Sequence, residues 1–168
     1  MGLIANYSCL SDANLKELKA MGSEEEEILE SVEEWNDEEE LLLDIDKMWD
    51  VLHFVLTGVS TDHKDDKNPL SQAVLGVTAV EDISDYVAYT EHNHLANIVA
   101  ALEQFDMESA LESFDMIACK AAELYPNIWD YDEEEEEIKD ELLHDFEQMK
   151  RFYKQVLDAN GNVLVSIC

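Results

Sequence analysis

The stretch from residue 43 to residue 58 constrains the fold most strongly, because its apolar residues recur at helical spacing. These residues would line one face of an α-helix, and they are Ile45, Met48, Trp49, Leu52, Val55 and Leu56. Asp44 stands where an N-cap residue would lie, and Gly58 stands where a left-handed residue commonly ends a helix. We therefore predict a buried central helix that begins near Asp44 and ends at Gly58.

Polar residues of the same stretch are the main candidates for a catalytic site. Asp46, Asp50 and His53 are separated by four and three residues, so a continuous helix would align them in one stripe. Such a stripe could hold a divalent metal ion or orient His53 as a general base. We favour a structural interpretation, in which these side chains bond to neighbouring backbone groups, and we expect neither a metal nor a cofactor.

Both ends of the chain alternate in the manner of β-strands. Residues 3 to 10 predict a first strand, and Val163, Val165 and Ile167 predict a last strand that pairs with it. Between them, helical periodicity and capping residues predict helices after Ser11, at residues 23 to 35, after Thr90 and along a seam from Ile138 to Val156. The expected fold is α+β: one helix-rich domain over residues 1–168, with a small sheet that includes the N- and C-terminal strands.

The net charge limits the classes of partner. The chain carries 41 acidic and 10 basic side chains, for a formal net charge of −31. Such a charge repels phosphates and anionic lipids, so it disfavours direct binding to nucleic acid or membranes. The three cysteines, Cys9, Cys119 and Cys168, have no metal-ligand spacing and are expected to be reduced thiols of a cytoplasmic protein.

Two acidic runs suggest a surface for a basic protein partner. They lie at residues 24 to 27 and 132 to 137, and aromatic residues precede the second run. Carboxylates would steer a cationic partner, and exposed aromatic side chains would anchor it. The candidate partner-binding residues are Glu24, Glu25, Glu26, Glu27, Trp129, Tyr131, Asp132, Glu133, Glu134, Glu135, Glu136 and Glu137. The simpler alternative is that these acids form solvated helix ends.

Three further features carry a resemblance to a known family. They are the block Asp-Lys-x-Trp-x-x-Leu-His-x-x-Leu-Thr-Gly at residues 46 to 58, the segment Pro-Leu-Ser-Gln-Ala-Val-Leu-Gly at residues 69 to 76, and Tyr125-Pro126 before the final helix. With the strand at each end, these segments resemble the YfbM-like family of small bacterial proteins of unknown function. The resemblance implies a compact α+β domain but supplies no reaction.

The sequence thus supports two main hypotheses for function. The preferred one is a non-enzymatic acidic protein-binding module, for example an inhibitor or immunity-type protein that engages a basic partner. The alternative is a hydrolase or metal-dependent enzyme centred on Asp46, Asp50 and His53. A third hypothesis is mimicry of DNA by spaced carboxylates. The oligomeric state is left open.

Overall fold

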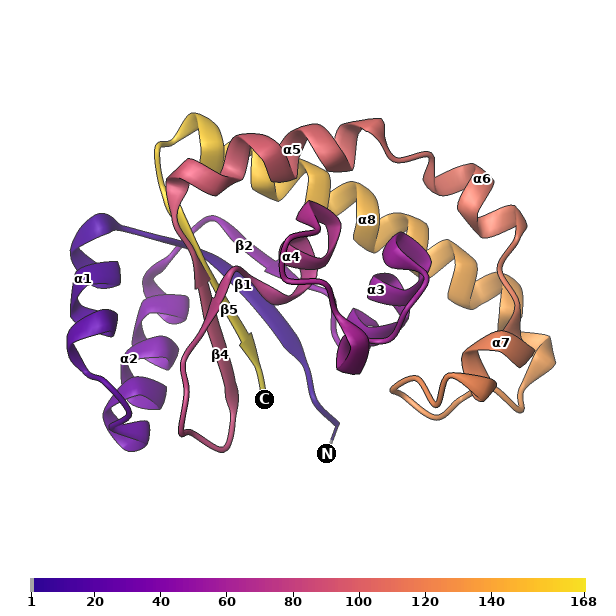
Figure 1. The fold of residues 1–168 in the computed structure, drawn as a ribbon, viewed down its shortest axis with the longest axis horizontal. Coiled ribbons are helices and arrows are strands. Elements are labelled where there is room, and N and C mark those ends of the chain that lie inside the picture. Colours follow the sequence, from indigo (N-terminus) through magenta and orange to yellow (C-terminus); the bar gives the residue numbers. More distant parts are fainter. Residues whose placement is uncertain (1) are drawn as a thin grey trace.

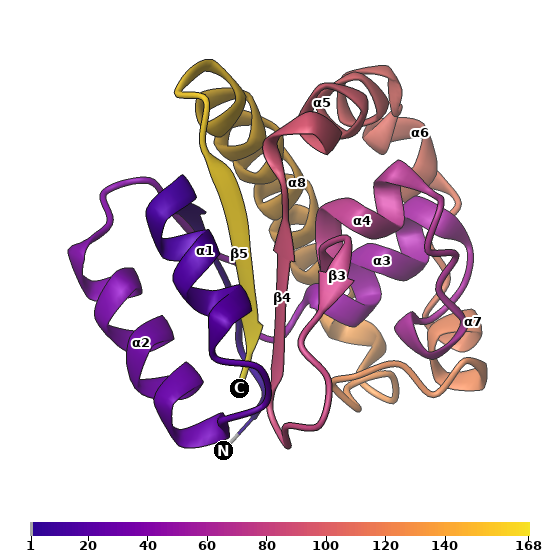
Figure 2. The same ribbon diagram turned by 60° about the vertical axis from the view of Figure 1, so that its left-hand side comes forward.

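A five-stranded antiparallel sheet lies between two layers of helices (Figures 1 and 2). The computed structural model of the chain describes residues 2–168. The order of the strands in the sheet is β2-β1-β5-β4-β3. The strands are β1 (Ala5–Leu10), β2 (Leu42–Asp44), β3 (Thr78–Ala79), β4 (Tyr86–Thr90) and β5 (Asn162–Ile167). The predicted α+β class and the sheet containing both terminal strands are confirmed.

The two terminal strands lie side by side near the centre of the sheet. Tyr7 of β1 is opposite Val165 of β5, and Ala88 of β4 is opposite the same valine from the other side. All three side chains are completely buried. Because side chains alternate between the faces of a strand, a slip of one residue would turn these groups to the opposite face, so burial fixes the register.

The helices form two layers of unequal size. Figure 2 shows α1 and α2 on one face of the sheet and the remaining helices on the other. Within residues 2–168, no helix has the length and apolar character that a membrane span requires. The α-helices are α1 (Asp12–Ala20), α2 (Glu25–Glu38), α3 (Trp49–Thr57), α4 (Pro69–Leu75), α5 (Leu95–Gln104), α6 (Met107–Glu112), α7 (Met116–Ala121) and α8 (Glu135–Asp158), and the 3-10 helices are η1 (Thr61–His63), η2 (His92–His94) and η3 (Asp132–Glu134).

Each layer has its own hydrophobic core. The smaller core joins α1 and α2 to the sheet through residues such as Leu18, Ile28 and Leu164. The larger core contains the predicted seam of α8, whose residues are all buried: Ile138, Leu142, Phe146, Met149, Tyr153 and Val156. The spacing of this seam in fours and threes keeps one face of α8 against the core along its length.

Three tyrosines hold α4 in place. The hydroxyls of Tyr153, Tyr7 and Tyr86 donate hydrogen bonds of 2.6 Å to the carbonyl oxygens of the last three residues of α4, which are Ala73, Val74 and Leu75 respectively. The last carbonyls of a helix lack partners within the helix, so the three phenols satisfy groups that would otherwise be buried without a bond.

The central helix is shorter than its sequence pattern predicts. Leu42–Asp44 forms strand β2, and α3 begins only at Trp49, so Asp44 is not its N-cap. Leu43 pairs with Tyr7, and this pairing overrides the local helical periodicity. The end of the helix is predicted correctly, since Gly58 adopts a left-handed conformation with φ of 83°.

The helix predicted at residues 23 to 35, with Ser23 as the start of a capping box, has different bounds in the structure. Helix α2 has Glu24 at its N-cap position and no side-chain hydrogen bond there, and it extends to Glu38 rather than ending at Trp35. The extra turn brings Asn36 and Asp37 into the helix, and this placement shapes the site described below.

Candidate functional site

Asp50 binds two loops that are distant in sequence. It lies in the first turn of α3 and is 6% exposed. One carboxylate oxygen accepts a hydrogen bond of 2.9 Å from the backbone N–H of Thr61, and the other accepts one of 2.9 Å from the N–H of Tyr125. Both oxygens are therefore engaged by the chain itself, and Asp50 joins the segment after α3 to the segment before α8.

His53 is completely buried, and both of its ring nitrogens have partners. Nδ1 lies 2.8 Å from the carbonyl oxygen of Val59, which can only accept, so Nδ1 carries the proton. Nε2 is left as an acceptor for the hydroxyl of Ser71, at 2.6 Å. Burial lowers the pKa of His53 below its ordinary value, although the hydrogen bond to Val59 and the charge of Asp50 oppose this shift. The neutral ring joins α3, α4 and the loop between them.

Asp46 does not share a helix face with Asp50 and His53. It lies in the turn between β2 and α3, is exposed and has a positive φ of 49°. The backbone N–H of Asp46 donates a hydrogen bond of 2.7 Å to the carboxylate of Asp44, and this bond fixes the turn. The predicted polar stripe of three residues is thus interrupted. Residues 2–168 contain no group of three or more His, Cys, Asp or Glu side chains that could hold a metal ion.

The two acidic runs occupy the first turns of helices. Glu25, Glu26 and Glu27 begin α2, where negative charge interacts favourably with the helix dipole. Glu25 also accepts hydrogen bonds from the backbone N–H of Ser84, at 2.8 Å, and from its hydroxyl. The second run forms η3 and the first turn of α8, with Lys139 3.6 Å from Glu136.

The two predicted aromatic anchors have different positions. Trp129 is only 3% exposed, and its indole N–H donates to the carbonyl oxygen of Leu124 at 3.0 Å. It belongs to the larger core, so its expected exposure is wrong. Tyr131 is 53% exposed and lies directly before the second acidic run.

A hollow of about 570 Å³ lies between α2 and the edge of the sheet, and we call it the acidic groove. Helix α2 contributes residues at helical spacing, among them Leu29, Val32, Glu33 and Asp37. Strand β2 contributes its three residues, of which Leu42 is 50% exposed. The groove therefore combines an apolar surface with carboxylates.

Four carboxylates line the acidic groove, and they come from three separate segments: Glu33, Asp37, Asp44 and Asp85. None of them forms an ion pair with another residue of the described chain. The side-chain oxygen of Asn36, which also lines the groove, is buried without a hydrogen-bond partner in the described part of the chain. The groove thus presents acceptors and negative charge and suits a cationic group.

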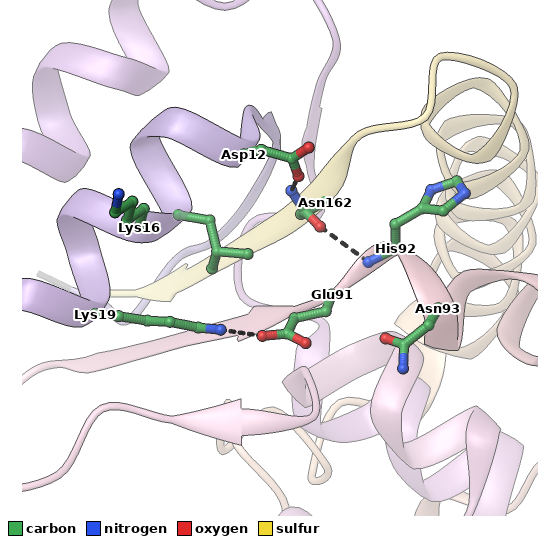
Figure 3. A pocket seen from close by; sticks show the side chains of 8 residues that line it. Asp12, Lys16, Lys19, Glu91, His92, Asn93 and Asn162 are labelled. Carbon is green, nitrogen blue, oxygen red and sulfur yellow. Dashed lines mark hydrogen bonds and ion pairs between the residues drawn. The ribbon is translucent and has the colours of Figure 1, made fainter.

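A second hollow, of about 540 Å³, lies between α1 and the end of β4 (Figure 3). Lys19 forms an ion pair with Glu91 across it. The buried amide of Asn162 donates to Asp12 at 2.9 Å and accepts from the backbone N–H of His92 at 2.9 Å. Figure 3 shows these groups directed at one another, so we interpret this hollow as a polar joint between α1 and the sheet.

Asp145 is the buried acid that sequence analysis missed. It is 7% exposed, and one of its carboxylate oxygens has no hydrogen-bond partner within residues 2–168. Burial raises the pKa of Asp145 from 3.8 to about 7. Three neighbouring carboxylates, those of Glu141, Asp44 and Asp46, add to this increase. The sequence signal was an aspartate three residues after Leu142, inside the apolar seam of α8.

Comparison with known proteins identifies relatives of this chain. A family model described as "Domain of unknown function (DUF1877)" matches residues 1–166. Protein YfbM of Escherichia coli (strain K12) is 33% identical over 126 residues, which cover 74% of this chain and 75% of YfbM.

A solved structure has the same fold. The crystal structure described as that of a protein of unknown function, YfbM from Escherichia coli, matches with a TM-score of 0.81 at 27% sequence identity. The match covers 98% of this chain and 99% of the other, so the arrangement of helices and strands is shared over nearly the whole length.

Proposed function

This chain belongs to the DUF1877 family, and from that premise we propose that it is a non-enzymatic binding module whose acidic groove captures a basic segment of a protein partner. The observation that carries the proposal is the set of four carboxylates beside an apolar surface in one groove. A segment with lysine or arginine next to aliphatic residues would complement both parts of this lining.

The edge position of β2 supports the same proposal. Strand β2 pairs only with β1 among the described strands, so its other side is an edge of the sheet. Leu42 is half exposed on this strand, and apolar side chains of this kind commonly become the buried centre of an interface. A partner segment could therefore bury Leu42 while its cations meet Asp44 and Asp37.

The acidic runs would act at longer range. Glu24, Glu26 and Glu27 at the start of α2, together with residues 132 to 137, are mostly exposed and add to the net charge of −31. Such a field accelerates the approach of a basic partner and weakens as salt rises. An inhibitor or immunity-type protein for a basic partner would use long-range attraction by the acidic runs together with capture in the acidic groove.

The enzymatic alternative has less support. Asp50 and His53 use their polar atoms in bonds to Thr61, Tyr125, Val59 and Ser71. A general base needs a free acceptor within reach of a substrate proton, and these bonds leave neither residue available in that way.

Fluorescence anisotropy with a defined basic peptide tests the proposal. The probe is a short labelled peptide that alternates Lys and Leu, and its counterpart has Glu in place of Lys. We expect the basic peptide to bind, with affinity that falls as ionic strength rises above about 0.15 M, and the acidic peptide not to bind. The double variant Glu33→Gln/Asp37→Asn should weaken binding by about tenfold.

The matched control is Glu30→Gln/Glu34→Gln. These two exposed acids lie on α2 outside the groove and carry the same charge change. If both double variants weaken the peptide equally, binding depends only on overall charge, and the groove is not the site. Circular dichroism of each variant would verify that α2 is intact.

A further inference from the structure

Another pocket, of about 300 Å³, opens beside Trp49; we call it the Trp49 pocket, and it shares only Asp85 with the lining of the acidic groove. Its lining comes from several segments that meet there: the chain before β1, the start of α3, η1 with the residue after it, the end of α4, the turn before β4 with the first residue of β4, and the end of β5. Its volume is at the lower end of the range for small-molecule sites, so it suits a ligand about the size of an amino-acid side chain.

Aromatic and aliphatic side chains form the apolar part of the Trp49 pocket. Trp49 is 9% exposed, its indole N–H donates to the carbonyl oxygen of Leu3 at 3.1 Å, and its ring stacks on Tyr125 with centroids 5.3 Å apart. The hydroxyl of Tyr86 is bonded to Leu75. These contacts fix the rings of Trp49 and Tyr86, so the apolar part of the pocket is preformed.

The charged part of the pocket is predominantly negative. Asp62 and Asp85 line it, and neither forms an ion pair with another residue of the described chain. Lys64 also lines the pocket, but its ammonium lies 3.3 Å from the carboxylate of Asp66. Two carboxylates are therefore left to interact with a ligand.

The buried acid of α3 shapes one wall of the pocket. Asp50 holds the backbone N–H of Thr61, and His53 holds the carbonyl of Val59, so both ends of the segment 59–61 are tied to α3. Thr61 and Asp62 both line the pocket. Two of the three residues that the sequence marked as catalytic candidates, Asp50 and His53, thus position the wall of a ligand-sized pocket and do not line it.

We propose that the Trp49 pocket binds a small aromatic organic cation, with its ring against Trp49 and Tyr86 and its protonated nitrogen facing Asp62 and Asp85. An aromatic ring matches the apolar surface that Trp49 and Tyr86 form, and the two carboxylates attract the protonated nitrogen. The strongly negative charge of the whole chain favours a cation over an anion of the same shape.

Isothermal titration calorimetry at about 0.15 M salt tests the ligand class with four small molecules. Three carry the same phenyl ring and differ in charge, and the fourth is a cation without a ring. They are phenethylammonium, the neutral 2-phenylethanol, the anionic 3-phenylpropanoate and the aliphatic butylammonium. We expect phenethylammonium to bind at least about tenfold more tightly than each of the others. A shift of the indole N–H resonance of Trp49 on binding would locate the ring.

Variants of the two carboxylates test the site. Asp62→Asn and Asp85→Asn should each weaken phenethylammonium by about five- to tenfold. Asp65→Asn is the matched control, since Asp65 is exposed in the same loop outside the pocket lining and should leave the affinity unchanged. Asp85 lines both the Trp49 pocket and the acidic groove, so the variants that distinguish the two proposals are Asp62→Asn, which lies outside the groove, and Glu33→Gln/Asp37→Asn, which lies outside the pocket.

Several results would overturn the inference. Equal binding of 2-phenylethanol would mean that the carboxylates do not contribute, and equal binding of butylammonium would exclude recognition of a ring. Unchanged affinity in both Asp62→Asn and Asp85→Asn would place the cation elsewhere on the acidic surface.

Discussion

Asp50 and Asp145 are buried to the same degree, at 6% and 7% exposure, but their carboxylates have opposite surroundings. Both oxygens of Asp50 accept backbone hydrogen bonds of 2.9 Å. One oxygen of Asp145 has no partner in the described chain, and its neighbours include Glu141 and Asp46, which are also acids. The protein therefore binds one buried carboxylate tightly and leaves the other under electrostatic strain.

The difference comes from what each helix faces. Helix α3 lies beside two loops whose N–H groups have no partner in a helix or strand, and a carboxylate satisfies them. Helix α8 contacts β2, which ends at Asp44, and the charges of Asp44 and of Asp46 in the turn after β2 both act on Asp145. Burial alone thus does not reveal the role of an ionisable side chain, because the groups that meet it decide whether its charge stabilises the fold.

Removal of the Asp50 carboxylate should have the largest effect. Asp50→Ala leaves the N–H groups of Thr61 and Tyr125 without their charged acceptor, and each bond to a charged group contributes about 1.5–3 kcal/mol. We expect the free energy of unfolding to fall by about 3–5 kcal/mol, measured by urea denaturation. Asp62→Ala, an exposed acid on the loop that Asp50 holds, is the control and should change stability little.

The variant Asp50→Asn sharpens this prediction. Asparagine keeps one acceptor oxygen but not the charge, so a loss of about half the alanine effect is expected. A loss below about 0.5 kcal/mol in both variants would contradict the view that Asp50 is a structural joint.

Neutralisation of Asp145 should have the opposite sign. Its pKa in the folded protein is raised to about 7, so the folded state binds more protons than the unfolded state between about pH 4 and pH 7, and stability is lost as pH rises through that range. Asp145→Asn removes this loss. We expect it to stabilise the protein by about 2–3 kcal/mol more at pH 8 than at pH 5.

The control for Asp145 is Asp140→Asn on an exposed position of the same helix. It removes one negative charge without relieving a buried carboxylate, so its effect should be small at both pH values. An equal gain from both variants at pH 8 would mean that net charge, and not the environment of Asp145, limits stability.

Much of the fold could be predicted because local pattern and tertiary contacts agree there. The alternation of the terminal strands, the left-handed glycine at position 58 and the seam of α8 are each visible in sequence and present in the structure. The start of α3 could not be predicted, because Ile45 and Met48 keep a helical spacing although the chain from Leu42 to Asp44 pairs with β1. Tertiary pairing replaced a local preference at that point.

The candidate sites were harder to predict for a related reason. Glu33 and Asp37 were visible as acids of a helix, but the acidic groove exists only because β2 lies beside α2. Asp145 becomes strained only when β2 and its turn bring Asp44 and Asp46 to it. Sequence spacing gives the face of one helix, whereas these sites need two or three segments whose relative positions the sequence did not supply.

Loss of the Ser71 hydroxyl extends the comparison to a neutral group. Ser71 is buried and donates to Nε2 of His53 at 2.6 Å, so Ser71→Ala leaves a buried ring nitrogen without its donor. We expect a loss of about 1–2 kcal/mol in the free energy of unfolding, less than for Asp50→Ala because no charge is involved. Thermal or urea denaturation at pH 8 would measure it.

His53 itself should respond to pH in the direction opposite to Asp145. Because burial lowers its pKa, the folded state binds fewer protons than the unfolded state below pH 6.5, and stability falls as pH drops through that region. An NMR titration should show the midpoint of His53 below 6.5 and a proton on Nδ1 at neutral pH. A midpoint above 6.5 would indicate a charged ring and would contradict the bonding described for Val59 and Ser71.

The smallest expected effects concern two of the tyrosines that donate hydrogen bonds to α4. They make the same kind of bond at different degrees of burial, so comparing them tests how burial changes the value of the bond. Tyr153→Phe removes only a hydroxyl that donates to Ala73, and both residues are buried, so a loss of about 1 kcal/mol is expected. Tyr86→Phe removes the same kind of bond at a half-buried position, where water can replace the donor, and should cost less. If the two variants lose equal stability, burial does not set the value of these bonds. The contrast between Asp50 and Asp145 does not depend on this outcome, because the two acids are almost equally exposed and differ in their hydrogen-bond partners and neighbouring charges.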